Sequence, residues 1–185
     1  DQQVWCAAST HPGEDEAVLA AHARIGGLLI LVPRHAERAE AIAALIRTAG
    51  LTMAQRSRGE APDGQTDVYL ADTMGEMGLW FRLAPVAFVG GSLARVGGHN
   101  PYEPAQLDTA ILHGPHVDNF AEIYTALDAE GGALPVSGAE DLAAAVRRLQ
   151  AGEHERVARA AAGVVRRAQG ATEAALQAIL EQLTY

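Results

Sequence analysis

The 185-residue sequence contains no lysine and only one cysteine, Cys6. Without lysine the chain has no amine for a Schiff base or a phosphate clamp, so every permanent cation is an arginine guanidinium with bidentate geometry. A single cysteine excludes an intrachain disulfide and a cysteine-rich metal site, and its place in an apolar run predicts a core side chain. No apolar run approaches the roughly 18 residues of a membrane span, and no signal peptide is visible.

Positive charge is scarce as well. The chain has 14 basic and 23 acidic residues and a formal net charge of −9, which argues against a nucleic-acid partner because such binding needs a basic surface. An anionic small ligand stays compatible, since a few local donors decide its binding. The 49% hydrophobic content is enough for a buried core, and the length fits one domain or half of a two-domain enzyme. Because the chain starts at Asp1 and enters a strand at once, we expect residues 1–185 to be one domain of a longer protein.

Short apolar runs alternate with amphipathic stretches along the whole chain. Strands are predicted at 4–9, 28–33, 51–57, 67–72, 85–91, 110–115 and 132–137. Helices are predicted at about 13–25, at 36–49 with Gly50 as a C-cap, at 75–82, and from 139 to the end with candidate breaks at Gly152, Gly163 and Gly170. Strands that are apolar on both faces and separated by helices predict an α/β fold, a Rossmann-like doubly wound parallel sheet with helices on both faces. In such sheets ligands bind beyond the carboxyl ends of the strands.

Five polar loops, rich in glycine and proline, follow predicted strands and therefore meet at that edge. The loop after residue 89 begins with Gly90, Gly91 and Ser92, whose amides at a following helix start could bind an anion. A tight strand-to-helix turn without a ligand is the alternative. The loop has neither the GxGxxG fingerprint nor the GxxxxGK[ST] phosphate loop, which disfavours NAD binding and P-loop ATPase chemistry.

The same loop continues into "GGHNPYEP", where Asn100 is predicted as an N-cap and Pro101 as the first helical residue. Glu103 then lies in the first turn, where a carboxylate could accept two hydrogen bonds from the vicinal diol of a ribose. Plain capping is the alternative for this carboxylate. Pro104 stiffens the turn.

Two further loops offer ligand contacts. Arg34 ends a buried strand and could bind a phosphate or carboxylate bidentately, or form a surface salt bridge, while His35 fits a helix start as readily as a ligand contact. In "DTMGE", Asp72 or Thr73 is predicted to cap a helix whose first amides include those of Gly75 and Glu76, either for a ligand or as a capping box alone.

Four histidines lie in these loops, at His11, His99, His113 and His116. No pair has HxxxH or HExxH spacing and carboxylates are not clustered beside them, so no metal is predicted. A Ser–His–Asp triad is disfavoured by the absence of a GxSxG elbow. The loops supply amides, one arginine and a diol-binding carboxylate, which predicts the nucleotide-sugar-binding half of a transferase.

The ordered set "WCAASTHPGEDE", "LLILVPRHAER", "VYLADTMGEMG", "VAFVGGSLARVGGHNPYEPA" and "GPHVDNF" resembles the C-terminal domain of 3-deoxy-D-manno-octulosonic acid (Kdo) transferases over nearly the whole chain. The resemblance implies a two-domain GT-B glycosyltransferase of Gram-negative bacteria that transfers Kdo from CMP-Kdo to a lipid A precursor, with inversion and without a metal or other cofactor. It also implies that an N-terminal domain carries the membrane anchor, the acceptor surface and the catalytic base, at the cytoplasmic face of the inner membrane. No catalytic residue is then expected in residues 1–185, which alone would be inactive.

Carried over residue by residue, the resemblance places the CMP of the donor on nine residues: Pro33, Arg34, Met74, Gly75, Glu76, Asn100, Pro101, Tyr102 and Glu103. Contacts with the phosphate or the Kdo unit are expected from Ser9, Thr10, His11, Gly90, Gly91, Ser92 and His99. The chain departs from the family pattern at three positions: Pro12 replaces an acid, Tyr102 a common leucine, and Asp108 a small residue.

Two other readings of the sequence stay open. One is another GT-B transferase or epimerase that uses a UDP-sugar. The other is a nucleotide-binding regulatory module without catalysis.

Overall fold

The computed structural model describes the backbone of residues 3–183 and the side chains of residues 3–170. Its strands are β1 (Val4–Thr10), β2 (Leu28–Pro33), β3 (Met53–Gln55), β4 (Val68–Leu70), β5 (Val86–Val89), β6 (Ala110–His113) and β7 (Ala133–Pro135). Its helices are α1 (Glu14–Ile25), α2 (Ala39–Thr48), α3 (Met77–Leu83), α4 (Tyr102–Gln106), α5 (Ala121–Ala129), α6 (Ala139–Arg148) and α7 (His154–Leu183).

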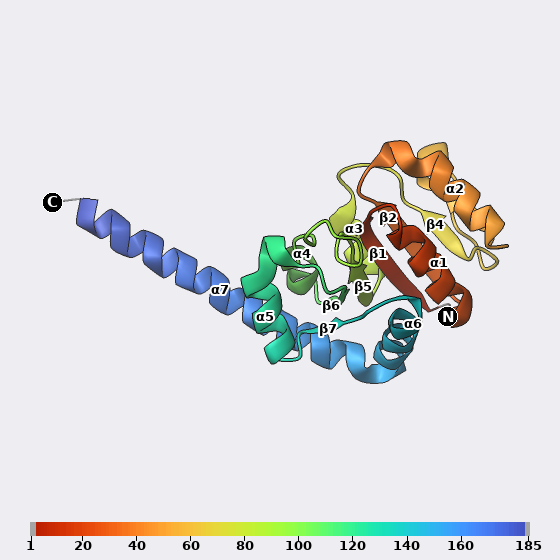
Figure 1. The fold of residues 1–185 in the computed structure, drawn as a ribbon. Coiled ribbons are helices and arrows are strands. Elements are labelled where there is room, and N and C mark those ends of the chain that lie inside the picture. Colours follow the sequence, from red (N-terminus) through yellow and green to blue (C-terminus); the bar gives the residue numbers. More distant parts are fainter. Residues whose placement is uncertain (1–2, 184–185) are drawn as a thin grey trace.

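The seven strands form one sheet in the order β3-β4-β2-β1-β5-β6-β7, and every neighbouring pair is parallel (Figure 1). The predicted doubly wound α/β fold is therefore confirmed. The chain runs from β1 to β2 and on to the edge strand β3, inserts β4 between β2 and β3, and then crosses to the other side of β1 to form β5. The crevice between the carboxyl ends of β1 and β5 is thus the topological switch point, where such sheets bind ligands.

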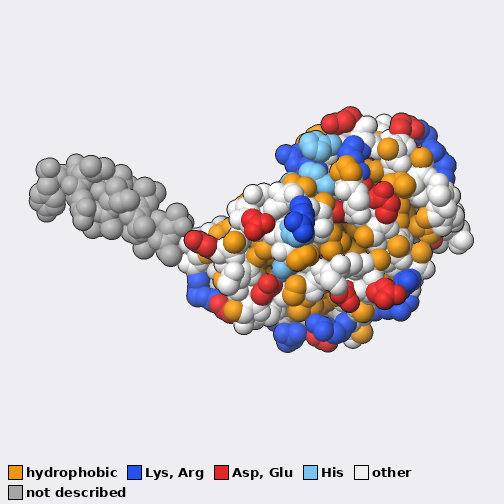
Figure 2. All heavy atoms as spheres, in the orientation of Figure 1, with side chains coloured by type: hydrophobic (Ala, Val, Ile, Leu, Met, Phe, Trp, Pro, Cys, Tyr) orange, Lys and Arg blue, Asp and Glu red, His pale blue; other side chains and the backbone are white. Residues whose placement is uncertain are grey.

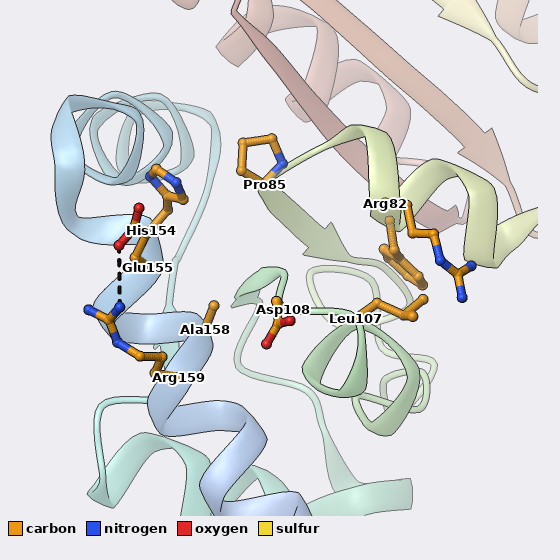
Figure 3. A pocket seen from close by; sticks show the side chains of 9 residues that line it. Arg82, Pro85, Leu107, Asp108, His154, Glu155, Ala158 and Arg159 are labelled. Atoms are coloured by element: carbon orange, nitrogen blue, oxygen red, sulfur yellow. Dashed lines mark hydrogen bonds and ion pairs between the residues drawn. The ribbon is translucent and has the colours of Figure 1, made fainter.

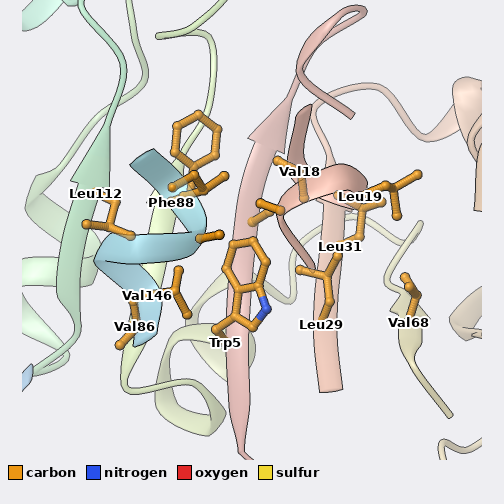
Figure 4. Packing of buried hydrophobic residues seen from close by; sticks show 14 of the residues in the cluster. Trp5, Val18, Leu19, Leu29, Leu31, Val68, Val86, Phe88, Leu112 and Val146 are labelled. Atoms are coloured by element: carbon orange, nitrogen blue, oxygen red, sulfur yellow. The ribbon is translucent and has the colours of Figure 1, made fainter. Parts of the chain in front are cut away.

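Alternate residues of each strand pack on opposite faces, as the pleat of a strand requires. In β1, Trp5 and Ala7 face one core with Leu29 and Leu31 of β2, and the helices covering this face are α1, α2 and α6 (Figure 4). Cys6 and Ala8 of β1 face the opposite side, which α3 covers near β1 and β2, while α5 and α7 cover β6 and β7. Cys6 is fully buried, so its predicted core role is confirmed.

Hydrogen bonds tie the amino end of the sheet to α1. The Trp5 indole Nε1 donates to Nδ1 of His22 at 3.1 Å, so the other ring nitrogen, Nε2, carries the proton that it donates to the Asp67 carbonyl at 2.8 Å. Burial lowers the pKa of His22, although the Asp67 carbonyl opposes the effect. The neutral imidazole therefore serves as a core residue.

Several predicted boundaries differ from the structure. The third strand ends at Gln55, because Arg56–Arg58 form a 3₁₀ turn, and Ala36–Arg38 form another before α2. Gly50 follows α2 with φ 72°, in the left-handed conformation expected of a glycine just past a helix.

The predicted helix breaks meet different outcomes. Gly152 does break the C-terminal helical region, with φ 127° between α6 and α7. Gly163 and Gly170 lie inside α7, so their prediction as breaks is wrong. Asp108, which stands where the family usually has a small residue, has φ 56°. Aspartate fits this position because it tolerates the left-handed region better than most side chains.

Candidate functional site

A buried carboxylate joins the first and fifth loops at the switch point. Glu14, at the start of α1, has no exposed surface and accepts hydrogen bonds from five backbone amides. Its Oε2 accepts from Gly91 at 2.7 Å and His11 at 2.9 Å, and its Oε1 accepts from residues 92–94 at 2.8–3.2 Å. The loop after β5 therefore wraps around a carboxylate supplied by the chain itself.

This arrangement corrects the argument that the Gly90–Ser92 amides are free to bind a ligand. Residues 91–96 form turns instead of a helix start, and the amides from Gly91 onward already have Glu14 as their anion. Two side chains predicted to touch the phosphate or Kdo are also withdrawn from solvent. Ser92 Oγ donates to the Val89 carbonyl at 2.6 Å, and the Thr10 hydroxyl donates to the buried Asp15 at 2.7 Å.

Glycine is required at Gly90 by close packing. A Cβ there would lie 2.6 Å from the Ser9 carbonyl oxygen and 2.9 Å from that of Ala8. Ser9 itself has φ 57°, at the irregularity where β1 shifts register against β2. The ends of β1 and β5 thus approach each other closely at the switch point.

Three histidines and two arginines, Arg34 and Arg38, surround the same point. The imidazoles of His11 and His99 stack with an interplanar angle of 11° and share a hydrogen bond between their Nε2 atoms, 2.8 Å apart. His35 meets His11 edge-on, with ring centroids 5.7 Å apart. Arg38 donates to the Thr10 carbonyl at 3.1 Å and forms an ion pair with buried Asp15. Histidine side chains reach the molecular surface beside arginines in the space-filling view (Figure 2).

A narrow groove of about 110 Å³ opens beside this cluster. Its lining brings together the carboxyl ends of β1 and β2, Arg34 just after β2, and the segment between β4 and the start of α3: Ser9, Val32, Pro33, Arg34, Thr73, Met74, Gly75, Glu76 and Met77. One groove at the carboxyl edge of the sheet therefore brings together six of the predicted site residues: Ser9, Pro33, Arg34, Met74, Gly75 and Glu76.

Two side chains of the groove are open to a ligand. The Arg34 guanidinium is exposed and has no hydrogen-bond partner among the side chains of residues 3–170, while its backbone amide donates to the Thr10 carbonyl at 3.1 Å. Met74 is 69% exposed, which is unusual for a large apolar side chain at a groove wall. A free cation beside an exposed apolar surface suits a ligand with an anionic group and a flat ring.

The "DTMGE" segment differs from its prediction. Helix α3 starts at Met77 with Glu76 as its N-cap, so Gly75 and Glu76 precede the helix. Asp72 does not cap it, because its carboxylate accepts from the Gln55 amide at 2.7 Å and the Ser57 hydroxyl at 2.6 Å.

Glu76 is held by an arginine that the sequence analysis missed. Arg56 donates to it through Nε at 3.2 Å and NH2 at 2.7 Å, and the Thr73 hydroxyl also donates to it. These bonds, Arg56 first, hold the pKa of Glu76 at about 2. Arg56 therefore neutralises the charge of Glu76 at the groove wall. Among the residues that line the groove, this leaves Arg34 as the uncompensated charge.

The fourth predicted segment begins at Asn100. Helix α4 starts at Tyr102, one residue later than predicted, and the Asn100 side-chain oxygen accepts from the Tyr102 amide at 2.9 Å. Glu103 is exposed, and its Oε1 lies 3.2 Å from the point where a Cβ on Gly78 would stand. Gly78 follows Met77 of the groove, so the Glu103 carboxylate lies near the same end of α3.

Tyr102 is not brought to the groove. Its side chain lines a separate cavity between α5 and α7, together with Ile123 and Arg167. The Tyr102 side chain therefore lies outside this groove, and a donor contact of Tyr102 stays a prediction.

A roomier hollow of about 490 Å³ lies at the other end of the strands (Figure 3). Pro85 and Asp108, which precede β5 and β6, face His154 and Ala158 of α7 across it. Ligands of doubly wound sheets bind at the carboxyl ends, so size alone does not make this hollow the candidate site.

Residues 3–170 contain no cluster of three or more histidine, cysteine or acidic side chains that could hold a metal ion. No helix among residues 3–183 combines the length and the apolar composition that a bilayer crossing requires. Sequence reasoning missed Arg38, Arg56 and the carboxylates of Glu14 and Asp15. Their only sequence signal was position: Glu14, Asp15 and Arg38 closely follow predicted strands, and Arg56 lies at the end of the strand predicted at 51–57.

The fold is that of the C-terminal domain of a GT-B glycosyltransferase. The C-terminal domain of a glycosyl transferase group 1 family protein (LpcC) from Francisella tularensis superimposes with a TM-score of 0.56 at 13% identity, over 88% of this chain and 84% of that one. The spinosyn rhamnosyltransferase SpnG gives a TM-score of 0.53 at 13% identity, over 89% of this chain and 40% of that one. At such identities the likeness shows the fold alone.

Sequence identity is far higher with one family. The C-terminal CMP-Kdo binding domain of WaaA from Acinetobacter baumannii is 35% identical over 89% of both chains, with a TM-score of 0.80. The 3-deoxy-D-manno-octulosonic acid transferase of Haemophilus influenzae is 42% identical over 146 residues, which are 76% of this chain and 34% of that protein. The transferase of Bordetella pertussis is 39% identical over 188 residues, 92% of this chain and 44% of that protein.

The chain belongs to the 3-deoxy-D-manno-octulosonic acid transferase family and matches its C-terminal domain. It spans less than half the length of these curated relatives. No family model matches the chain.

Proposed function

We propose that this chain is the donor-binding domain of an inverting glycosyltransferase that moves Kdo from CMP-Kdo to a lipid A precursor. The observation that carries the proposal is the groove at the carboxyl edge, which the Arg34 guanidinium, without a side-chain partner among residues 3–170, lines together with Met74, Gly75 and Glu76. The family membership supports the same donor, because the WaaA domain of Acinetobacter baumannii is described as CMP-Kdo binding.

Each part of CMP has a suitable partner in the groove or beside it. Arg34 supplies a bidentate cation for the phosphate. The exposed Met74 side chain offers apolar surface for one face of the cytosine ring, and Pro33 lines the groove beside it. The exposed Glu103 carboxylate can accept both hydroxyls of the ribose, next to the Asn100–Pro101 turn that sets the start of α4.

The reaction needs stabilisation of the leaving group. Cleavage of the bond between Kdo and phosphate leaves CMP with an additional negative charge, and a cation placed at that oxygen lowers the barrier. Arg34 supplies this charge without a metal or another cofactor. The catalytic base, the acceptor surface and attachment to the cytoplasmic face of the inner membrane belong, in this proposal, to the other domain of the full-length protein.

Calorimetry of the 185-residue chain tests donor recognition. CMP should bind more tightly than UMP or UDP, and Arg34→Ala should weaken CMP binding by about tenfold or more, since a charged hydrogen bond contributes roughly 1.5–3 kcal/mol. The matched control is Arg47→Ala, which removes an exposed arginine of α2 outside the groove and should leave CMP binding unchanged. A preference for UDP would overturn the proposal in favour of another nucleotide-sugar enzyme.

Kinetics of the full-length enzyme test the catalytic role. Arg34→Ala should lower kcat/KM for Kdo transfer by about 2–4 kcal/mol of transition-state stabilisation, and a chelator should leave the wild-type rate unchanged. Wild-type kinetics in Arg34→Ala would refute the role given to this guanidinium.

A further inference from the structure

The paired imidazoles of His11 and His99 carry an inference that rests on the proposed function. Their Nε2 atoms are 2.8 Å apart, a hydrogen-bond distance, so one of these nitrogens holds a proton and the other accepts it. Two fully protonated imidazoliums have only donors and cannot form this bond. The pair is therefore either neutral or singly charged, and one added proton converts the first state to the second.

The surroundings disfavour the charged state while no ligand is bound. Both rings are half-buried, and burial is the main cause that lowers the pKa of His11 and of His99. Arg34 and His35 lower both values further, and Arg38 also lowers that of His11. Glu14 acts in the opposite direction on both rings, but its carboxylate is already engaged by five backbone amides.

The pair is held in place by elements on both sides of the switch point. The His11 amide donates to Glu14 at 2.9 Å, and the His99 carbonyl accepts from the Tyr124 hydroxyl at 2.9 Å. The His99 amide donates to the Gly90 carbonyl at 3.2 Å. Such anchoring fixes the two rings beside the groove end that Ser9 and Arg34 line.

We infer that His11 and His99 form one subsite for an anionic oxygen group of the donor and that the pair takes up one proton when this anion binds. An anion beside the rings reverses the balance set by Arg34, His35 and Arg38, so the singly charged pair becomes the stable state. CMP-Kdo carries two such groups, the phosphate and the sugar carboxylate. The shared proton keeps the pair intact in both states, so the anion is bound without movement of either ring.

Calorimetry in buffers of different ionisation enthalpy counts the protons taken up. The 185-residue chain is titrated at pH 7.5–8.5 with CMP and with cytidine, and the CMP-saturated chain is then titrated with 3-deoxy-D-manno-octulosonate. Proton uptake is expected with CMP, if the phosphate occupies the subsite, or in the last titration, if the carboxylate does. Cytidine should bind without uptake.

Variants assign the proton to the pair. The double variant His11→Gln/His99→Gln should abolish the uptake and weaken binding of the anion that causes it by about tenfold, with cytidine binding unchanged. His154→Gln, at the start of α7 and outside the cluster, should behave like wild type. The single variants His11→Gln and His99→Gln each keep one imidazole that can still take up the proton, and a thermal melt of each variant confirms that it is folded.

Three outcomes would overturn the inference. The first is the absence of proton uptake with either anion. The second is uptake that persists in the double variant His11→Gln/His99→Gln, which would place the proton on the nucleotide phosphate, whose own pKa is about 6. The third is an equal loss of cytidine and CMP binding. None of these outcomes touches the proposed function as long as CMP still binds in preference to UDP, whereas a chain that binds no CMP contradicts the proposed function itself.

Discussion

Replacement of Glu14 by glutamine tests the carboxylate that organises the switch point. Each oxygen of Glu14 accepts at least two backbone amides, and the side chain has no exposed surface. Glutamine keeps one oxygen and replaces the other by an NH₂ group, which cannot accept. In the better orientation the amides of residues 92–94 keep their acceptor, while those of Gly91 and His11 face a donor.

The cost follows from those two lost bonds. A buried donor left without a partner costs roughly 1–3 kcal/mol, and bonds to a charged acceptor lie in the upper half of that range. Two such donors predict that Glu14→Gln lowers the free energy of unfolding by about 4 kcal/mol. For a chain of this size the melting temperature should fall by about 8–16 °C, at roughly 2–4 °C per kcal/mol.

Urea denaturation of the 185-residue chain measures this loss. The matched control is Glu16→Gln, two residues further along α1, because Glu16 is exposed and the substitution removes the same charge. The control should stay within about 0.5 kcal/mol of wild type. Equal midpoints for the two variants, with unchanged denaturant slopes, would refute the reasoning that the buried carboxylate holds the loop after β5.

Two further stability predictions concern close packing and pH. Gly90→Ala should destabilise the chain by about 1–3 kcal/mol, because the new methyl group meets two backbone carbonyls. The control, Gly163→Ala inside α7, should stabilise the chain by about 0.5–1 kcal/mol, because alanine favours a helix interior over glycine. Chemical denaturation measures both changes, and equal effects would contradict the packing argument. The lowered pKa of His22 makes the unfolded state bind protons first, so its contribution to stability should be complete above about pH 6.5 and be lost as pH falls below that value. Urea midpoints between pH 5 and 8 should therefore depend less on pH in His22→Gln than in wild type, and an identical slope in both would argue against a buried neutral imidazole.

The fold was predictable because its signals are local. The continuous aliphatic run Leu28–Pro33, which a proline ends, favours a strand buried on both faces, and it is β2 in the structure. Gly50 and Gly152 mark chain breaks through backbone conformations that few other residues adopt. Alternation of such runs with helices leads to a parallel sheet, and hence to a ligand edge, without any knowledge of tertiary contacts.

Part of the groove was predictable for the same reason. Pro33, Arg34 and the Met74–Glu76 loop follow strands, and parallel strands all end at one edge, so their meeting follows from the topology. The residue that caps each helix was not predictable from the sequence. Asp72 or Thr73 was expected to cap α3, but Gln55 and Ser57 occupy the Asp72 carboxylate, the Thr73 hydroxyl donates to the Glu76 carboxylate, and this competition exists only in the folded sheet.

The amino-acid sequence by itself determined the sheet, the edge at which its loops gather and the family to which the chain belongs. Only the tertiary structure decided which polar groups remain free for a ligand. Glu14 reaches amides more than seventy residues away, and His11 shares a proton with a ring 88 residues along the chain. Strand and helix patterns depend on residues that are close in the sequence. The pairing of a hydrogen-bond donor with its acceptor depends on distances that exist only after the chain has folded.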